Sequence, residues 1–377
     1  MTPELQHDPG ADIADLAPHC VGLTEADLHL SPTFIDFVVR WLSGARFEEQ
    51  RWPNQLSEEL WNPLPRMEAA AEFRLQRLLL DPEGQSIIDR VYEWFVSLAT
   101  GRMDDLKALH GRYHFIAIVG IPRTGGSYLT SEIFRALDYE SRQVPAAVAH
   151  DGFPNARPFS LYEQENSWID GLMSISEYLV TLELFFARDC RESRIIVPKK
   201  VTKAIYSSGL FKCVFGPRAE YLVTVRHPIA CCISTYEKSG GLPTDGKMKV
   251  RSAIERWIGR DLHETGVRFA DLPTMDYFDA YVRYWEQFYI TLALSGMLAR
   301  RDYSVIPYGK EAMEQTAQRF HARYNSKEKP AEFMVSPGLR ARHPDWVVRA
   351  QKAVARVTDV WNLVGLEFPQ AALEAVS

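Results

Sequence analysis

The sequence predicts an α/β protein in which helices flank a central parallel sheet, with a helical N-terminal extension. Up to about Gly111, apolar residues recur at three- and four-residue spacing, which is typical of amphipathic helices. After that point, short apolar runs alternate with glycine- or proline-marked turns and helical stretches, the pattern of a mostly parallel sheet. One of these runs, FIAIV, leads through a glycine-rich loop into an amphipathic segment.

The expected elements follow in chain order. Helices are expected in the extension at the segments FIDFVVRWL, MEAAAEFRLQRLLL and SIIDRVYEWFVSLA. Strands are expected at Phe115–Val119, Arg194–Val197, Tyr221–Val225 and Tyr303–Pro307, in a sheet of about five strands. Aromatic residues at helical spacing between about 242 and 299 are read as core. The division is therefore a helical extension at residues 1–111, packed on the main domain, and an α/β domain at residues 112–377 with a helical insertion at about 242–299.

The composition favours a soluble protein of the cytoplasm. With 377 residues, 46% hydrophobic and 24% charged, the chain is long enough to bury a sizeable core. The first residues are polar and acidic, unlike a secretory signal, and no apolar run reaches the length that a bilayer demands. The formal net charge of −6 gives no long-range attraction for nucleic acid or an anionic membrane, so we expect neither as a partner. An anionic ligand would have to be held by a local pocket.

Cysteine usage indicates neither a disulfide framework nor a metal centre. The five cysteines are odd in number and stand without CxxC or Cys/His ligand spacing. A reducing compartment fits this usage, and we expect no bound metal. Cys231 and Cys232 are expected to be packed helix residues rather than reactive thiols.

The most specific feature is the glycine loop, which we define as Gly120 to Ser127. A strand before it and a helix after it form the arrangement that cradles a phosphate. Gly125 and Gly126 let the backbone approach an anion closely, and the N–H groups of Thr124 to Tyr128 would open the helix toward that anion. The hydroxyl of Ser127 is a further candidate ligand. The alternative is a glycine turn between strand and helix that holds no ligand.

The glycine loop departs from the Walker A form at its lysine. Gly120, Gly125 and Ser127 fall in register with G-x-x-x-x-G-K-[ST], but Gly126 stands at the lysine position. Arg123 supplies a cation three positions earlier, where it could reach the oxygen between a nucleotide and the group being transferred. This Pro-[Lys/Arg]-[Ser/Thr]-Gly-x-[Ser/Thr] loop resembles the 5′-phosphosulfate loop of sulfotransferases that use 3′-phosphoadenosine 5′-phosphosulfate (PAPS).

The resemblance extends to a second anion site. The segment AEYLVTVRHPIACCISTYEK is an apolar strand followed by Arg226, a turn and a helix, and Pro228 suits the first turn of that helix. Arg226 is therefore expected at the carboxyl end of the strand, where open α/β sheets bind ligands. In the sulfotransferase family an arginine and a serine at this interval hold the 3′-phosphate, and Arg226 and Ser234 match them. His227 is read as a turn residue.

The general base that an acceptor hydroxyl or amine requires is ambiguous. The family's histidine after the second strand is missing, because this chain reads VPKKVTK there. Lys199 or Lys200 could contact the oxygens of the transferred group, and we assign Lys200; a solvated basic turn is the alternative. His150 is the preferred base, because its neutral form accepts a proton near pH 7. The other candidate bases are Asp151, Glu163 and Glu165.

The resemblance covers about Tyr113 to Phe368 and leaves the N-terminal helical part outside. Within it, Ser336 to Arg342 is distantly similar to the basic segment that closes over the 3′-phosphate in the family, although we expect this segment to be exposed to solvent. What the resemblance implies is a P-loop-type fold and a PAPS-dependent sulfotransferase. Arg123 would stabilise the leaving phosphate, residues 124–128 would hold the 5′ end of the nucleotide, and Arg226 with Ser234 would hold the 3′-phosphate.

The expected reaction transfers a sulfuryl group to a hydroxyl or amine of a small acceptor and releases adenosine 3′,5′-bisphosphate (PAP). The abundant aromatic residues favour an apolar or lipid-like acceptor, although core packing explains them equally well. Two alternatives stay open. One is a P-loop kinase or hydrolase, which would lack both its lysine and an acidic Walker B strand end here. The other is a noncatalytic nucleotide-binding protein that keeps the two anion sites but has lost its base. A homodimer is compatible with the expected sulfotransferase.

Overall fold

A computed structural model of the chain describes residues 30–44, 73–140, 143–150, 167–187, 194–202, 204–205, 208–238, 275–299, 301–336 and 344–375. The chain forms two compact units. The first unit comprises Met1–Ile116, Tyr139–Lys199 and Gly209–Ala219, and the second comprises Ala117–Asp138, Lys200–Ser208 and Glu220–Ser377. Each unit draws on several parts of the chain, so neither coincides with residues 1–111 or 112–377, and that division stays a prediction.

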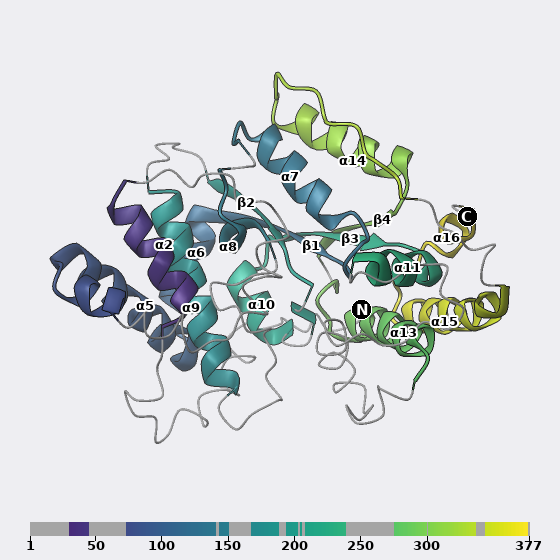
Figure 1. Ribbon diagram of the computed structural model, residues 1–377, viewed down its shortest axis with the longest axis horizontal. Helices are drawn as coiled ribbons and strands as arrows, with labels where there is room; N and C mark the ends of the chain where they lie inside the picture. The colour runs from purple at the N-terminus through teal and green to yellow at the C-terminus, as the bar shows by residue number, and fades with distance from the viewer. Residues whose placement is uncertain are drawn as a thin grey trace, which may run out of the picture. The chain divides into compact units, whose positions relative to one another are not determined.

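Helices and short strands alternate along the chain (Figure 1). The strands are β1 Tyr113–Val119, β2 Ile195–Lys200, β3 Glu220–Val225 and β4 Asp302–Pro307. The helices up to β3 are α2 Pro32–Leu42, α5 Pro82–Thr100, α6 Met103–Arg112, α7 Gly126–Ala136, α8 Ala146–Ala149, α9 Ser167–Phe185 and α10 Ser208–Phe215. Those after β3 are α11 Pro228–Lys238, α13 Tyr277–Leu294, α14 Lys310–Arg323, α15 Pro344–Leu363 and α16 Gln370–Ala375. In this part of the chain, no helix combines the length and the apolar character that crossing a bilayer would take.

The four strands form one parallel sheet in the order β2-β1-β3-β4. All four predicted strands are confirmed, whereas a fifth is not found within the residues that the structure describes. β3 and β4 pair in register from Glu220 with Asp302 to Val225 with Pro307. Every residue of β3 is buried, as expected for a central parallel strand whose two faces are both covered by other elements.

Helices cover both sides of the strands in the second unit. Helix α7 packs beside α14, and α11 and α15 pack against α13. Figure 1 shows α7 and α14 on one side of β3 and β4, with α11, α13 and α15 on the other. The aromatic residues of α13 are core, as predicted, since Tyr277, Tyr281, Tyr284, Trp285 and Tyr289 are all fully buried. Of the predicted insertion at about 242–299, residues 239–274 lie outside the described part.

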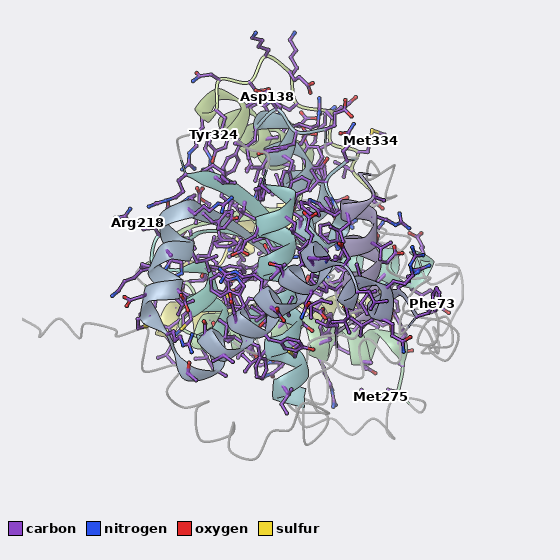
Figure 2. The ribbon with its side chains drawn as sticks, turned by 90° about the vertical axis from the view of Figure 1, so that its left-hand side faces the viewer. Phe73, Asp138, Arg218, Met275, Tyr324 and Met334 are labelled. Carbon is purple, nitrogen blue, oxygen red and sulfur yellow. The ribbon has the colours of Figure 1, made fainter. Side chains whose placement is uncertain are left out.

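The helices of the first unit confirm two of the three predicted for the extension, α2 and α5. Ser31 caps α2 by accepting from the N–H of Phe34, and its own N–H and hydroxyl donate to the buried Glu177 carboxylate of α9. On α5, Arg90 donates to Glu183 of α9. Of the third predicted helix, residues 73–79 are described and helical, and Phe73 at its start is exposed (Figure 2).

Truncation of Trp361 on α15 should destabilise the second unit. Its side chain is fully buried, and its indole N–H donates to the carbonyl of Tyr289 at 2.9 Å. We expect Trp361→Ala to lower the free energy of unfolding by about 3–5 kcal/mol, since it leaves a cavity and removes a buried hydrogen bond. Leu363, two residues later and 82% exposed, is the control, and Leu363→Ala should change stability by less than about 0.5 kcal/mol. Equal losses in urea unfolding would contradict this view of the core.

Candidate functional site

The glycine loop joins β1 to α7 and holds two residues in the left-handed region. Gly125 has φ 92° and forms the N-cap of α7, and Arg123 has φ 72°. A glycine adopts this conformation freely, but an arginine in it costs about 1–2 kcal/mol, which surrounding contacts have to offset. Gly125 makes no side-chain cap hydrogen bond to α7, and the first amides of a helix have no acceptor within the helix itself. The second half of the loop is therefore shaped for main-chain donors at a helix N-terminus.

The first half of the loop is anchored on β3. A Cβ at Gly120 would lie 2.2 Å from Oγ1 and 2.6 Å from the carbonyl oxygen of Thr224, so only glycine fits there. The buried hydroxyl of Thr124 donates to the carbonyl of Ile121 and is hydrogen-bonded to Thr224 Oγ1, both at 2.7 Å. Thr124 can therefore offer a ligand its main-chain N–H, whereas its hydroxyl fixes the loop.

Lys200, at the end of β2, reaches the start of α7. A Cβ at Gly126 would lie 3.2 Å from Cε of Lys200 and 3.3 Å from Cγ2 of Ile118, so the lysine stem lies against this glycine. The Lys200 ammonium donates to Thr202 Oγ1 at 3.2 Å, and Thr202 in turn donates to the carbonyl of Gly120 at 3.0 Å. Lys200 is buried. A cation thus stands over the amides that follow Gly125, although the loop itself has no lysine.

Arg123, Ser234 and Arg226 meet at the loop, as the sequence predicts. Nε of Arg123 donates to Oγ of Ser234 at 2.9 Å, and Nη1 of Arg226 donates to the carbonyl of Arg123 at 3.1 Å. Ser234 lies on α11, which begins at Pro228 directly after the tip of β3. Arg226 and Ser234 are each only 3% exposed. The two predicted anion sites therefore adjoin one another within a single unit.

The charge of the two arginines is not compensated by a carboxylate in the described residues. The polar partners that the structure gives them are a hydroxyl and the main-chain carbonyls of Arg123 and Ser336. Arg226 is buried whereas Arg123 is exposed, and a buried guanidinium held by neutral acceptors makes its site strongly attractive to an anion. Cys231, whose Sγ donates to the carbonyl of Arg226 at 3.8 Å, is itself fully buried. Burial raises the pKa of the Cys231 thiol to about 12, as expected of a packed rather than a reactive cysteine.

Sequence reasoning missed Tyr308 and Met313. Tyr308 directly follows β4, and its ring lies under the Arg226 guanidinium, 4.0 Å from ring centroid to Cζ. Met313 of α14 packs on the loop, because a Cβ at Gly125 would lie 2.7 Å from its Cε. The parallel register of β3 and β4 carries the signal for Tyr308, since Val225 pairs with Pro307 and the next residues are Arg226 and Tyr308. Met313 carries no such signal, because it comes from a helix far along the chain.

The other predicted site residues either make contacts away from the loop or lie outside the described part of the chain. The Lys199 ammonium donates to the carbonyl of Ala147 at 2.6 Å and lies over the ring of Tyr178, so it is held within the first unit. His150 follows α8 in that same unit, 8% exposed, and its role as a base stays a prediction. The following residues lie outside the described part: Asp151, Glu163, Glu165, Arg340 and Arg342. Tyr128 donates its hydroxyl to the carbonyl of Ala331, so it too offers the loop its main-chain N–H.

No protein-family model, curated protein or solved structure matches the chain. What the site does is therefore argued from its own residues. These residues provide helix N-terminal amides, two guanidiniums and an ammonium, together with a serine hydroxyl. Donors of these kinds are suited chemically to the oxygens of an anion.

Because Gly120 lies so close to β3, adding a single methyl group at this position should destabilise the protein. We expect Gly120→Ala to lower the free energy of unfolding by about 1–3 kcal/mol, because the main-chain oxygen of Thr224 cannot move aside easily. Gly111→Ala on α6 is the matched control. A Cβ there meets nothing within 4 Å, so we expect stability to be unchanged or to rise by up to about 1 kcal/mol. Urea unfolding measures both, and a Gly120→Ala protein as stable as the parent would refute the anchoring of the loop on β3.

Proposed function

We propose that the protein is a P-loop-type sulfotransferase that binds PAPS and transfers its sulfuryl group to a hydroxyl or amine of a small acceptor. One observation carries the proposal. Arg226 donates to the carbonyl of Arg123, and Arg123 donates to Ser234, so one hydrogen bond joins the loop to the tip of β3 and another joins it to α11. A nucleotide that carries phosphates at both its 5′ and 3′ positions offers negative charge to both places at once.

The residues present fit such a nucleotide. The main-chain amides of residues 124–128 would hold the 5′ end, with the dipole of α7 adding attraction. Arg226 and Ser234 would hold the 3′-phosphate, and the buried guanidinium of Arg226 would gain there the anionic partner that its neutral neighbours do not supply. ATP has no phosphate at its 3′ position, so Arg226 favours a 3′-phosphorylated adenine nucleotide over ATP.

The bound nucleotide supplies the sulfuryl group and a phosphate leaving group. Arg123 holds its guanidinium beside the loop, fixed by Ser234, where it would stabilise negative charge on the leaving oxygen. Lys200 would contribute a second cation over the start of α7 toward the oxygens of the transferred group. A sulfuryl group carries less negative charge than a terminal phosphoryl group, so two fixed cations replace much of what a metal ion does in a kinase.

A P-loop kinase or hydrolase is the competing enzyme. The Walker lysine is absent, and a side chain at position 126 would meet Lys200 within about 3.2 Å. Lys200 thus supplies a cation over the loop from another strand. The residues after β3 are Arg226, His227 and Pro228, and none of them is a metal-binding carboxylate of the Walker B kind. These features disfavour the kinase, whereas a noncatalytic nucleotide-binding protein would keep both anion sites and lack a base.

The acceptor side of the proposal rests on the sequence. His150 is proposed as the base that takes the acceptor's proton, because a neutral imidazole does so near pH 7. The acceptor is proposed to be a small molecule of apolar or lipid-like character, and the protein is proposed to act in the cytoplasm. A screen of hydroxyl- and amine-bearing acceptors with labelled PAPS tests these points together. Transfer of label to any one acceptor would exclude the noncatalytic alternative.

Thermal stability with added nucleotide tests the proposal directly. PAP at about 100 times its dissociation constant should stabilise the protein by about 2.7 kcal/mol, which raises the melting temperature of a 377-residue chain by about 3–4 °C. ATP with magnesium at the same concentration should produce a much smaller rise. Stabilisation by ATP with magnesium alone would favour the kinase and refute the sulfotransferase.

If Lys200 contacts the transferred sulfuryl group, replacing it should change the affinity for PAPS but not the affinity for PAP. Lys200→Met should weaken the binding of PAPS by about 10- to 100-fold, the range of one charge-assisted hydrogen bond, and should leave PAP binding within about twofold. Lys199→Met is the matched control. It should lower stability, because the Lys199 ammonium is bonded within the first unit, and leave the ratio of the two affinities unchanged. Calorimetric titration gives both constants, and an unchanged ratio in Lys200→Met would remove Lys200 from the site.

A further inference from the structure

Tyr308 contacts Arg226 directly through its ring and indirectly, by way of Ser336, through its hydroxyl. Its ring supports the guanidinium in a cation–π contact at 4.0 Å. Its hydroxyl accepts a hydrogen bond at 3.0 Å from the N–H of Ser336, and the carbonyl of Ser336 accepts from Nη2 of Arg226, also at 3.0 Å. The main-chain N–H of Tyr308 donates to Val225 at 2.7 Å, which fixes the ring beside the tip of β3. Ser336 is thus held between the tyrosine and the arginine.

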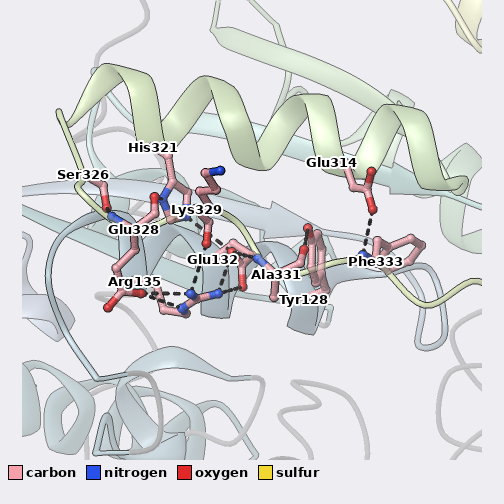
Figure 3. Close-up of polar contacts among 10 residues, drawn as sticks. All are labelled: Tyr128, Glu132, Arg135, Glu314, His321, Ser326, Glu328, Lys329, Ala331 and Phe333. Carbon is pink, nitrogen blue, oxygen red and sulfur yellow. Dashed lines mark hydrogen bonds and ion pairs between the residues drawn. The ribbon is translucent and has the colours of Figure 1, made fainter.

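Ser336 ends the strap, which we define as residues 326–336, and the strap is fixed along its length. Figure 3 shows it running beside α14 and α7. Ala331 is held by both of its main-chain groups, because its N–H donates to Glu132 at 3.0 Å and its carbonyl accepts from Tyr128 at 2.7 Å. The N–H of Phe333 donates to Glu314 at 3.0 Å.

A second set of contacts fixes the start of the strap. Arg135 of α7 donates to the carboxylate of Glu328 at 2.9 Å and to the carbonyl of Lys329 at 3.2 Å. The buried ring of His321 on α14 is hydrogen-bonded through Nδ1 to the carbonyl of Glu328 at 2.9 Å. These bonds do not involve Arg226. The entropic cost of bringing the Ser336 carbonyl to the arginine is therefore largely met by contacts elsewhere.

The carbonyl of Ser336 occupies a position on Arg226 that an anion bound to this arginine would use. It takes one N–H of the guanidinium, and a phosphate oxygen on that N–H would make a charge-assisted bond in its place. A ligand that uses this N–H has to displace the carbonyl first, and its apparent affinity falls by the strength of the contact that it breaks. The Tyr308 hydroxyl strengthens that contact, whereas the Tyr308 ring orients the guanidinium for any acceptor.

We propose that Tyr308 is a positioning residue for the Arg226 anion site, with two roles of opposite sign. Its ring holds the guanidinium ready for a phosphate of the ligand, and its hydroxyl holds the Ser336 carbonyl on Arg226 as an internal competitor of that phosphate. This inference deepens the proposed function and rests on it, because the ligand in question is the 3′-phosphate of an adenine nucleotide. The chemistry that it adds is a competition between a neutral carbonyl and an anion for the same donor.

Two substitutions at position 308 separate the two roles. Tyr308→Phe keeps the ring and removes the hydroxyl, so the free protein should melt at a lower temperature while PAP binds about two- to tenfold more tightly, the range of one net hydrogen bond. Tyr308→Leu removes the ring as well, so PAP should bind about fivefold or more weakly than to Tyr308→Phe. A purely structural tyrosine would lower stability without a gain in affinity, so the opposite signs of stability and affinity are the decisive readout.

Tyr324→Phe is the matched control. It removes another buried hydroxyl of the second unit, one without a hydrogen-bond partner among the described residues, and should leave the dissociation constant of PAP within about twofold. Calorimetric titration with PAP gives the affinities, and a thermal melt of each free protein gives the stabilities. If Tyr308→Phe binds PAP no more tightly than the parent, the competition is refuted while the proposed function stands. If the parent protein does not bind PAP at all, the proposed function is refuted and the inference falls with it.

Discussion

The hydrogen bond from Arg226 to the carbonyl of Arg123 is the constraint on which the candidate site depends. It joins the tip of β3 to the loop that follows β1, and it supports a residue whose backbone lies in the left-handed region. Arg226 is itself fixed from two sides, because its own carbonyl accepts from the indole of Trp285 at 2.9 Å and its guanidinium lies over Tyr308. The shape of the loop and the position of the buried charge are therefore set together. A loop of this shape without the arginine would lose one of the contacts that offset its strain.

The positions of the strands could be predicted from the sequence because buried parallel strands have a strong pattern. FIAIV is a continuous apolar run and EYLVTV is mostly apolar, as is typical of strands covered on both faces. The register of β3 on β4 and the exchange of chain segments between the two units could not be predicted in the same way. They depend on pairings between residues far apart in sequence, such as Val225 with Pro307. The local pattern of apolar and polar residues does not indicate such pairings.

The site could be predicted to the extent that its residues belong to local motifs. Arg123, Arg226 and Ser234 were identified from loop and strand-end motifs, and the structure brings them together. Lys199 and Lys200 were indistinguishable by type, although neighbours on a strand point to opposite faces and only one of them could reach the loop. In the structure the stem of Lys200 lies on Gly126, whereas the role of Lys200 stays a prediction. The left-handed conformation of Arg123 had no signal at all, since tertiary contacts impose it on a residue that disfavours it.

The central claim is that one nucleotide reaches both the loop and Arg226, and a comparison of two ligands on two proteins tests it most directly. Calorimetric titration of the parent and of Arg226→Ala with PAP and with adenosine 5′-monophosphate separates the 3′-phosphate from the rest of the ligand. The account predicts that the parent prefers PAP to the monophosphate by about 10- to 100-fold, the range of a charge-assisted contact, and that Arg226→Ala loses most of this preference, because only PAP carries the 3′-phosphate. An Arg226→Ala protein that keeps the full preference for PAP would contradict the account.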